Sequence, residues 1–242
     1  MIPVRSCMAA LALLALPGVA LADDTSAALG PFAPAEPAKA APDVTAVVTV
    51  TLASDYVWRG ESQNNQKPVA FLEVDLGAHG FYLDGRTENV DFAGSHQEYD
   101  NRAGYVVPLG HLKLDLGFIR YGYVHSMGNV DTLEGGATLS GDLGKLNWHA
   151  GTEFTRNYFG THLAGEYYEL GTTYQFRPNL AVSGNFAHQD VDHNMHYNTW
   201  NLALDYTLRK GLDLTVAYID SDIGAFGPLG GARAVGSVSF AF

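Results

Sequence analysis

The feature that most limits what this chain can fold into is a two-residue alternation of apolar and polar side chains, which persists from about residue 44 to the end. Leu112, Leu114 and Leu116, for example, alternate with Lys113 and Asp115. Because successive side chains of a β-strand point to opposite faces, this period indicates strands with one apolar and one polar face. The alternation recurs in twelve segments, at residues 49–59, 72–76, 81–86, 98–107, 112–118, 133–139, 146–154, 168–176, 180–186, 200–208, 212–218 and 238–242.

The connections between these segments alternate in length. Tight turns are expected at residues 77–80, 108–111, 141–145, 177–179 and 209–211. Longer polar loops are expected at residues 60–67, 90–97, 125–131, 157–165, 189–196 and 220–231. Short periplasmic turns and longer outer loops are typical of outer-membrane barrels. The sequence therefore predicts an all-β fold, an antiparallel transmembrane β-barrel of about 12 strands (about 10 to 14), with both chain ends on the periplasmic side.

The apolar face of the segments carries almost no charge, with Arg120 at the outer end of the fifth segment as the exception. A charge near the bilayer midplane would cost ~2–4 kcal/mol, so lipid contact requires this absence. Aromatic side chains such as Tyr56, Trp58 and Phe81 fall near segment ends, as expected at membrane interfaces. A water-soluble barrel or sandwich would explain the alternation, but not the asymmetry of the loops.

The first 43 residues differ from the rest of the chain. Residues 1–22 have the layout of a secretory signal peptide, with an apolar run and a small-residue cleavage site at Ala20-Leu21-Ala22. Cleavage there would remove Cys7, the single cysteine of the chain. Residues 23–43 are rich in Pro and Ala and predict a disordered periplasmic arm. Residues 44–242 are then the transmembrane barrel.

Composition and the C-terminus bear on the partners. The formal net charge of −12 argues against binding nucleic acid and is compatible with an interior that attracts cations. The final residues Val238-Ser239-Phe240-Ala241-Phe242 alternate and end in Phe, like the terminal strand signal that the bacterial barrel-assembly machinery reads. We therefore expect outer-membrane lipid, this machinery (through Phe242) and small solutes as partners.

Several motifs near the start of the barrel resemble those of a known family. Ser54-Asp55-Tyr56, Arg59-Gly60 and Ser62-Gln63 are similar to the opening motif of the TorF-like porin family, bacterial outer-membrane proteins of formerly unknown function. Further matches are Gly80-Phe81-Tyr82, Asn89-Val90-Asp91-Phe92, Glu98-Tyr99-Asp100, Ala103-Gly104-Tyr105, Leu116-Gly117 and Arg120-Tyr121. The resemblance is thin after Tyr123, and residues 84–88 depart from the pattern. It implies a barrel and a pore, but neither a substrate nor catalytic residues.

The polar face of the strands holds the candidate pore-lining residues. They are Asp55, Arg59, Glu73, Asp75, Asp84, Arg86, Glu98, Asp100, Arg102, Asp115, Glu153, Glu169 and Asp205. An excess of carboxylates in a confined passage favours cations. Alternatively, these charges pair across strands and fill the interior, since the width of twelve strands alone decides neither case. Arg59 either contacts an anion or substrate at the mouth or anchors the first loop by pairing with Asp55 or Glu61.

Histidines and carboxylates cluster in the predicted loop at residues 189–196 and just before it. His188, Asp190, Asp192, His193 and His196 offer nitrogen and oxygen ligands for zinc or copper. A solvated polar loop explains the same residues without a metal.

The sequence shows no enzyme signature. No Gly-x-Ser-x-Gly motif occurs, and spacing singles out no pair among the many carboxylates. We therefore expect no catalytic residues and no cofactor. The sequence predicts a bacterial outer-membrane porin for small hydrophilic solutes; the alternative is a non-conducting barrel whose outer loops bind a ligand, metal or surface partner.

Overall fold

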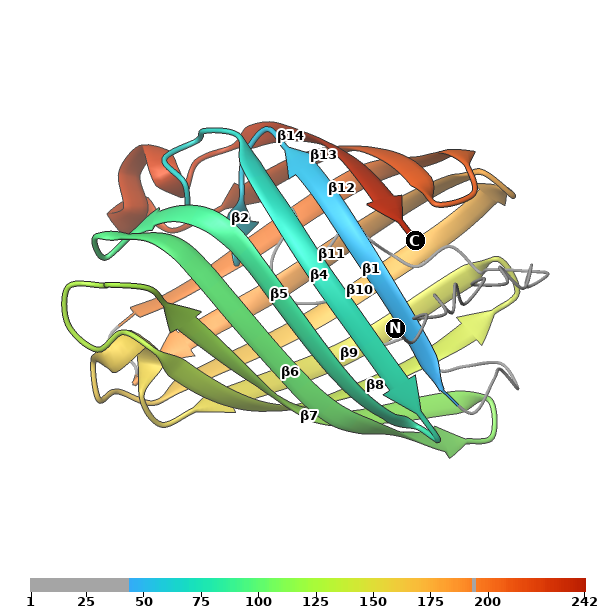
Figure 1. The fold of residues 1–242 in the computed structure, drawn as a ribbon, viewed down its shortest axis with the longest axis horizontal. Coiled ribbons are helices and arrows are strands. Elements are labelled where there is room, and N and C mark those ends of the chain that lie inside the picture. The colour runs from blue at the N-terminus through green and yellow to red at the C-terminus, as the bar shows by residue number, and fades with distance from the viewer. Residues whose placement is uncertain (1–43, 193–194) are drawn as a thin grey trace, which may run out of the picture.

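Twelve strands close into one antiparallel barrel in the computed structural model, which describes residues 44–192 and 195–242 (Figure 1). The barrel strands are β1 (Thr45–Ala53), β4 (Val69–Ala78), β5 (Phe81–Phe92), β6 (Ser95–Leu109), β7 (Leu112–Tyr123), β8 (Thr132–Leu143), β9 (Leu146–Thr155), β10 (Gly165–Arg177), β11 (Leu180–Val191), β12 (Met195–Arg209), β13 (Leu212–Ser221) and β14 (Arg233–Ala241). β1 pairs with both β4 and β14, so the sheet has no open edge. The predicted fold of about twelve antiparallel strands is confirmed.

One face of the barrel wall is apolar and points outward. Leu83 is 53% exposed and Leu202 is 58% exposed, whereas Asp84, the next residue after Leu83, is buried. Many other leucine, valine, phenylalanine and tyrosine side chains are exposed on this outer face in the same way. Exposed apolar area of this extent is unusual for a soluble monomer and indicates contact with an apolar environment.

All five tight turns lie at one end of the barrel, and each has two residues. They connect β4–β5, β6–β7, β8–β9, β10–β11 and β12–β13. Gly80, Gly144 and Gly211 adopt positive φ in these turns, as short hairpins require. The start of β1 and the end of β14 lie at this same end, because Thr45 pairs with Gly77 and Phe240 with Leu212.

Two of the predicted long loops are much shorter than expected. β5 continues to Phe92 and β6 begins at Ser95, so the loop predicted at residues 90–97 is wrong. Likewise, β11 ends only at Val191 and β12 already begins at Met195. Both strands therefore extend into the loop predicted at residues 189–196. In both cases the strand pairing continues beyond the clear alternation of apolar side chains.

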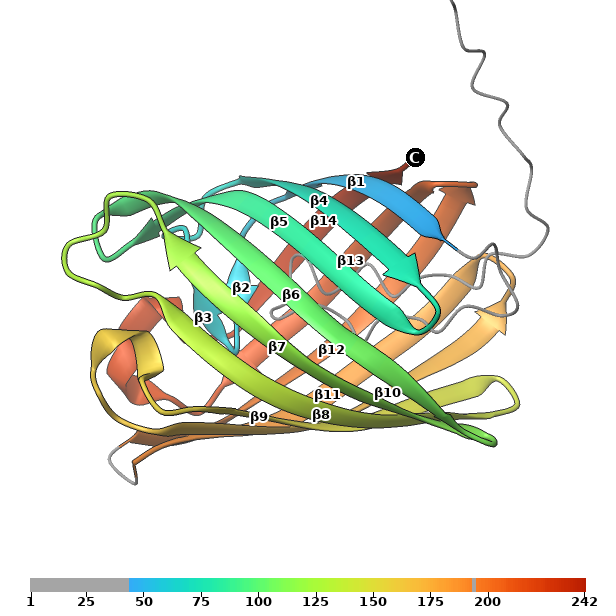
Figure 2. The same ribbon diagram turned by 60° about the horizontal axis from the view of Figure 1, so that its bottom comes forward.

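The chain between β1 and β4, residues 54–68, turns into the ring of strands (Figure 2): residues 55–60 and 62–64 are buried, and residues 65–68 are exposed. We call residues 54–68 the inward segment. It contains β2 (Val57–Trp58) and β3 (Glu61–Ser62), which pair with each other in a sheet separate from the barrel. The prediction of one strand over residues 49–59 is therefore wrong, since the barrel strand ends at Ala53.

Two short 3₁₀ helices, η1 (Tyr158–Gly160) and η2 (Gly224–Leu229), lie in long connections between barrel strands. Among the described residues, neither helix is long and apolar enough to cross a membrane. The predicted signal peptide and Pro/Ala-rich arm lie outside the described residues.

Candidate functional site

Arg59 of the inward segment spans the barrel interior. The barrel order places β8, β9 and β11 on the wall opposite β1 and β4, between which the segment enters. Arg59 Nη2 lies 2.5 Å from Glu134 Oε2 on β8, and Nη2 also donates to Glu153 on β9. Nη1 donates to Gln189 Oε1 on β11 at 2.8 Å. One guanidinium group therefore binds three strands of the far wall.

Aromatic rings enclose the same guanidinium group. The Arg59 Cζ lies 4.3 Å from the centre of the Trp58 ring and 4.0 Å from that of Tyr167 on β10. Trp58 in turn packs edge-on against Tyr121 of β7 and Phe159 of η1. The ring faces attract the cation and exclude water from its ion pairs. The outer part of the interior is thus occupied by side chains of the inward segment and the wall.

Burial makes the Arg59 contacts obligatory. The side chains of Arg59 and Glu134 are 1% and 2% exposed, while Glu153 is 25% exposed. Removing one partner of a buried ion pair leaves an uncompensated charge, which typically costs ~3–5 kcal/mol. The sequence hypothesis that Arg59 anchors the first loop agrees with these contacts, but Asp55 and Glu61 are not its partners.

Asp55 attaches the start of the inward segment to the barrel wall. Its carboxylate accepts a hydrogen bond from Ser62 Oγ at 2.7 Å and pairs with Arg233 of β14 at 3.0 Å. Asp55 therefore belongs to the segment and not to the first barrel strand, where the alternation placed it.

A second ion cluster lies on β5 and β6. Arg86 Nη2 donates to Glu88 Oε1 at 3.1 Å, to Asp100 Oδ2 at 2.8 Å and to the Tyr56 hydroxyl at 3.1 Å. Glu98 accepts a hydrogen bond from the Tyr123 hydroxyl at 2.8 Å. These side chains are buried, and the contact with Tyr56 connects the cluster to the inward segment.

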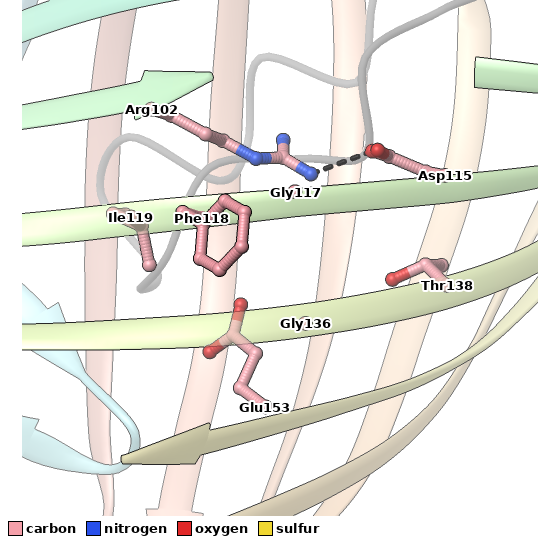
Figure 3. A pocket seen from close by; sticks show the side chains of 8 residues that line it. All are labelled: Arg102, Asp115, Gly117, Phe118, Ile119, Gly136, Thr138 and Glu153. Atoms are coloured by element: carbon pink, nitrogen blue, oxygen red, sulfur yellow. Dashed lines mark hydrogen bonds and ion pairs between the residues drawn. The ribbon is translucent and has the colours of Figure 1, made fainter. Parts of the chain in front are cut away.

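A third ion cluster joins β6 and β7 nearer the tight-turn end. Arg102 Nη2 lies 2.6 Å from Asp115 Oδ2, and the Tyr82 hydroxyl donates to Asp115 Oδ1 at 2.8 Å. A cavity of about 20 Å³ lies beside Arg102 and Asp115, with Glu153 and Thr138 also in its lining (Figure 3). A space of this size holds about one water molecule.

The other candidate pore-lining residues also lie on the inner face. Glu73 and Asp75 of β4 are half-buried and stand in register with Arg86 and Asp84 of β5. Glu169 of β10 lies 3.4 Å from the His149 ring. Asp205 of β12 accepts hydrogen bonds from Ser183 and Thr215. Whether solutes pass along these side chains stays a prediction.

The sequence analysis did not identify several residues that form contacts in the interior. Glu134 follows the same alternation as Glu153 and was identifiable by that signal. Gln189 was assigned to a loop, and its role depends on the unexpected length of β11. Arg233 gave no local signal, because its partner Asp55 is 178 residues away in sequence.

The predicted metal residues are distributed over two strands and a turn. His188 of β11 lies 3.0 Å from Asn198 Oδ1, Asp192 accepts a hydrogen bond from the backbone of Ala164, and His196 of β12 is exposed. Asp190 stands in register with His196. His193 lies outside the described residues. Since the described members do not assemble into a ligand group, this metal site stays a prediction.

Residues 37–237 match a protein family described as "Bacterial protein of unknown function (Gcw_chp)". The chain belongs to this family. The Gcw_chp description does not carry the TorF-like name, so that resemblance stays a prediction. No curated protein matches the chain.

Solved porin structures share the Gcw_chp chain's fold. The KdgM porin in complex with disordered oligogalacturonate has a TM-score of 0.59 at 13% identity, covering 82% of this chain and 99% of the porin. The NanC porin has a TM-score of 0.58 at 11% identity, with the same two coverages. At these identities the similarity establishes the barrel architecture.

Proposed function

We propose that this protein is a bacterial outer-membrane channel through which small hydrophilic solutes diffuse. The observation that carries the proposal is the closed barrel itself, with exposed apolar side chains outside and paired ionisable side chains inside. A closed barrel satisfies every backbone hydrogen bond internally, which a membrane-spanning structure requires. The shared fold of the KdgM and NanC porins supports this role.

The inward segment makes the proposed passage narrow. Arg59 and its aromatic neighbours occupy the outer part of the interior, and the segment is fastened to both walls. Solutes would pass beside this segment or after it moves, so we expect the channel to admit only small molecules.

The interior charge favours cations in this proposal. Carboxylates outnumber arginines in two of the three clusters: Glu134 and Glu153 bind Arg59, and Glu88, Glu98 and Asp100 lie around Arg86. In the third cluster Arg102 and Asp115 pair one to one. A passage lined by excess negative charge attracts cations and repels anions.

Contacts with lipid and with the assembly machinery belong to the same proposal. Phe242 is 69% exposed and Val238 is 44% exposed beside the end of β14. These apolar side chains are accessible to a partner that recognises the last strand, and afterwards to lipid.

Single-channel recording in planar bilayers tests the proposal. The mature barrel, refolded without residues 1–22, is expected to show small conductance steps and a reversal potential of the cation-selective sign under a KCl gradient. Anion selectivity would refute the cation preference but not the channel. The absence of conductance at every voltage would refute the channel function.

The second candidate is a non-conducting barrel that binds a ligand or partner through its outer loops. The packing of the inward segment against Glu134, Glu153 and Gln189 favours it, because these contacts fill part of the interior. The same recording separates the two functions.

A further inference from the structure

The strongest unassigned feature of the molecule is a group of three carboxylates on the inner face of β5 and β6. Glu88, Glu98 and Asp100 each offer an oxygen, and these three atoms all lie within 4.8 Å of one another. We call these three residues the carboxylate cluster. It is the one such group among residues 44–192 and 195–242.

Hydrogen bonds satisfy only half of the cluster's oxygens. Arg86 serves Glu88 Oε1 and Asp100 Oδ2, and the Tyr123 hydroxyl serves Glu98 Oε1. Glu88 Oε2, Glu98 Oε2 and Asp100 Oδ1 are buried and have no hydrogen-bond partner. The side chains of Glu88 and Asp100 are 0% exposed, so bulk water does not supply the missing contacts. Buried unsatisfied oxygens on three adjacent acids require a ligand or protons.

The charges of the cluster are not balanced by its neighbours. Three ionised carboxylates carry three negative charges, and Arg86, which bonds two of them, carries one positive charge. A net charge of two then remains in an interior from which water is excluded, where isolated charges are strongly disfavoured. One divalent cation supplies both the missing charge and the missing contacts.

The ligand chemistry and spacing select the cation. Carboxylate oxygens are hard ligands, which Ca²⁺ and Mg²⁺ prefer. Ca²⁺ binds oxygen at ~2.3–2.6 Å, so two ligands of one ion lie no more than ~4.6–5.2 Å apart, in agreement with the cluster. Mg²⁺ usually retains several water molecules and demands octahedral geometry, which a closed site does not favour.

We propose that Glu88, Glu98 and Asp100 form a Ca²⁺-binding site inside the barrel wall. Bound Ca²⁺ joins adjacent strands by side-chain bonds in addition to the backbone ladder. It also fixes the carboxylates that hold Arg86, which donates to Tyr56 of the inward segment. The ion therefore stabilises the outer part of the barrel and the segment inside it, and this role does not depend on whether the barrel conducts.

Binding is tested on the mature barrel, which is unfolded in urea with EDTA to remove metal ions, freed of EDTA and then refolded in detergent, because a buried site must be filled as the barrel forms. Refolding with Tb³⁺, a luminescent probe that takes oxygen ligands as Ca²⁺ does, is expected to give tyrosine-sensitised emission, because the Tyr123 hydroxyl contacts Glu98. Ca²⁺ present during refolding should compete for the site. Ca²⁺ should also raise the midpoint temperature of the heat-dependent shift in gel mobility, because a ligand that binds only the folded state stabilises it.

Three variants locate the site. Glu98→Gln and Asp100→Asn each remove a charged ligand and are expected to weaken the Ca²⁺ competition by more than about tenfold, since even outer-shell partners are worth 10–100-fold. Asp142→Asn, an exposed aspartate of β8, is the matched control and should bind like the parent. If either cluster variant fails to fold, Glu88→Gln takes its place.

Two outcomes overturn the proposal. The first is a parent protein whose emission does not saturate and whose midpoint temperature is unchanged by Ca²⁺, which would mean that protons neutralise the cluster. The second is Ca²⁺ competition that survives unchanged in the folded cluster variants, which would place the ion elsewhere.

Discussion

Arg59 and Glu134 form a buried ion pair, 2.5 Å from Nη2 to Oε2, across the interior of the barrel. Arg59 follows the first strand and Glu134 lies on β8, 75 residues later, on the far wall. The pair fixes the inward segment as a bridge across the barrel, and the space that remains beside this bridge sets the width of any passage.

Removing the Arg59 guanidinium is expected to destabilise the barrel. Arg59→Ala leaves Glu134 buried without its cation and should cost ~3–5 kcal/mol in the free energy of unfolding, measured by urea titration in detergent. Arg59→Lys should recover only part of this, because an ammonium group cannot donate to three wall residues in the same geometry. Arg156→Ala, which removes an exposed arginine, is the control. If it destabilised the barrel as much as Arg59→Ala does, the buried contacts of Arg59 would not account for the loss.

A side chain at position 60 should displace the inward segment. Gly60 has a φ of +85°, and a Cβ there would lie 2.8 Å from the Ser221 Cβ and from Thr199 Oγ1. Gly60→Ala should therefore expose the buried Arg59, and trypsin should cleave after Arg59 faster than in the parent. Gly85→Ala, with no atom within 4 Å of the added Cβ and no positive φ, should leave the cleavage rate unchanged. Equal resistance of all three proteins would contradict the packing described.

The pH dependence of stability should contain a contribution from Glu61 of the inward segment. Burial raises the pKa of Glu61 from 4.5 to about 7, against the opposing effects of a hydrogen bond with Gln63 and the charge of Arg233. The folded state therefore holds this proton more tightly than the unfolded state, and the resulting stability is lost as pH rises from 4.5 to about 7.

Glu61→Gln imitates the protonated acid and removes this loss. The variant should match the parent near pH 4 and be more stable than the parent at pH 8, by thermal unfolding at both pH values. A difference that is the same at both values would show that Glu61 does not titrate in this window.

A charge on the outer face should hinder insertion into lipid. Leu202 lies midway along β12 and is 58% exposed, so Leu202→Lys is expected to cost ~2–4 kcal/mol in folding into vesicles. Leu143, 68% exposed, ends β8 beside a tight turn, and Leu143→Lys should cost ~0–1 kcal/mol because the lysine reaches the interface. Equal costs at the two positions would contradict lipid contact along the middle of the strands.

The barrel could be predicted because its strands show a strict two-residue alternation of apolar and polar side chains. Leu202 and Leu204 alternate with inner residues, and the tight turns carry glycines, so strand number and facing follow from adjacent positions. Arg120, expected as the exception on the apolar face, pairs with Asp131 and stacks over Tyr99.

The inward segment escaped prediction because the alternation continues through it. Tyr56 and Trp58 match the apolar period and were assigned to the lipid interface, yet they are 0% and 4% exposed inside the barrel. Local sequence does not distinguish an aromatic ring that meets lipid from one that meets Tyr121 of the far wall. The partners of Arg59 depend on contacts 75 to 130 residues apart in sequence, which no local pattern encodes.

The most direct test of the account compares the single-channel conductance of the parent barrel and of Arg59→Ala in the same planar bilayers. We expect a small conductance for the parent and a conductance several times larger for Arg59→Ala, with Arg156→Ala equal to the parent. Identical conductance in all three, or none in any, would contradict a passage whose width the inward segment sets.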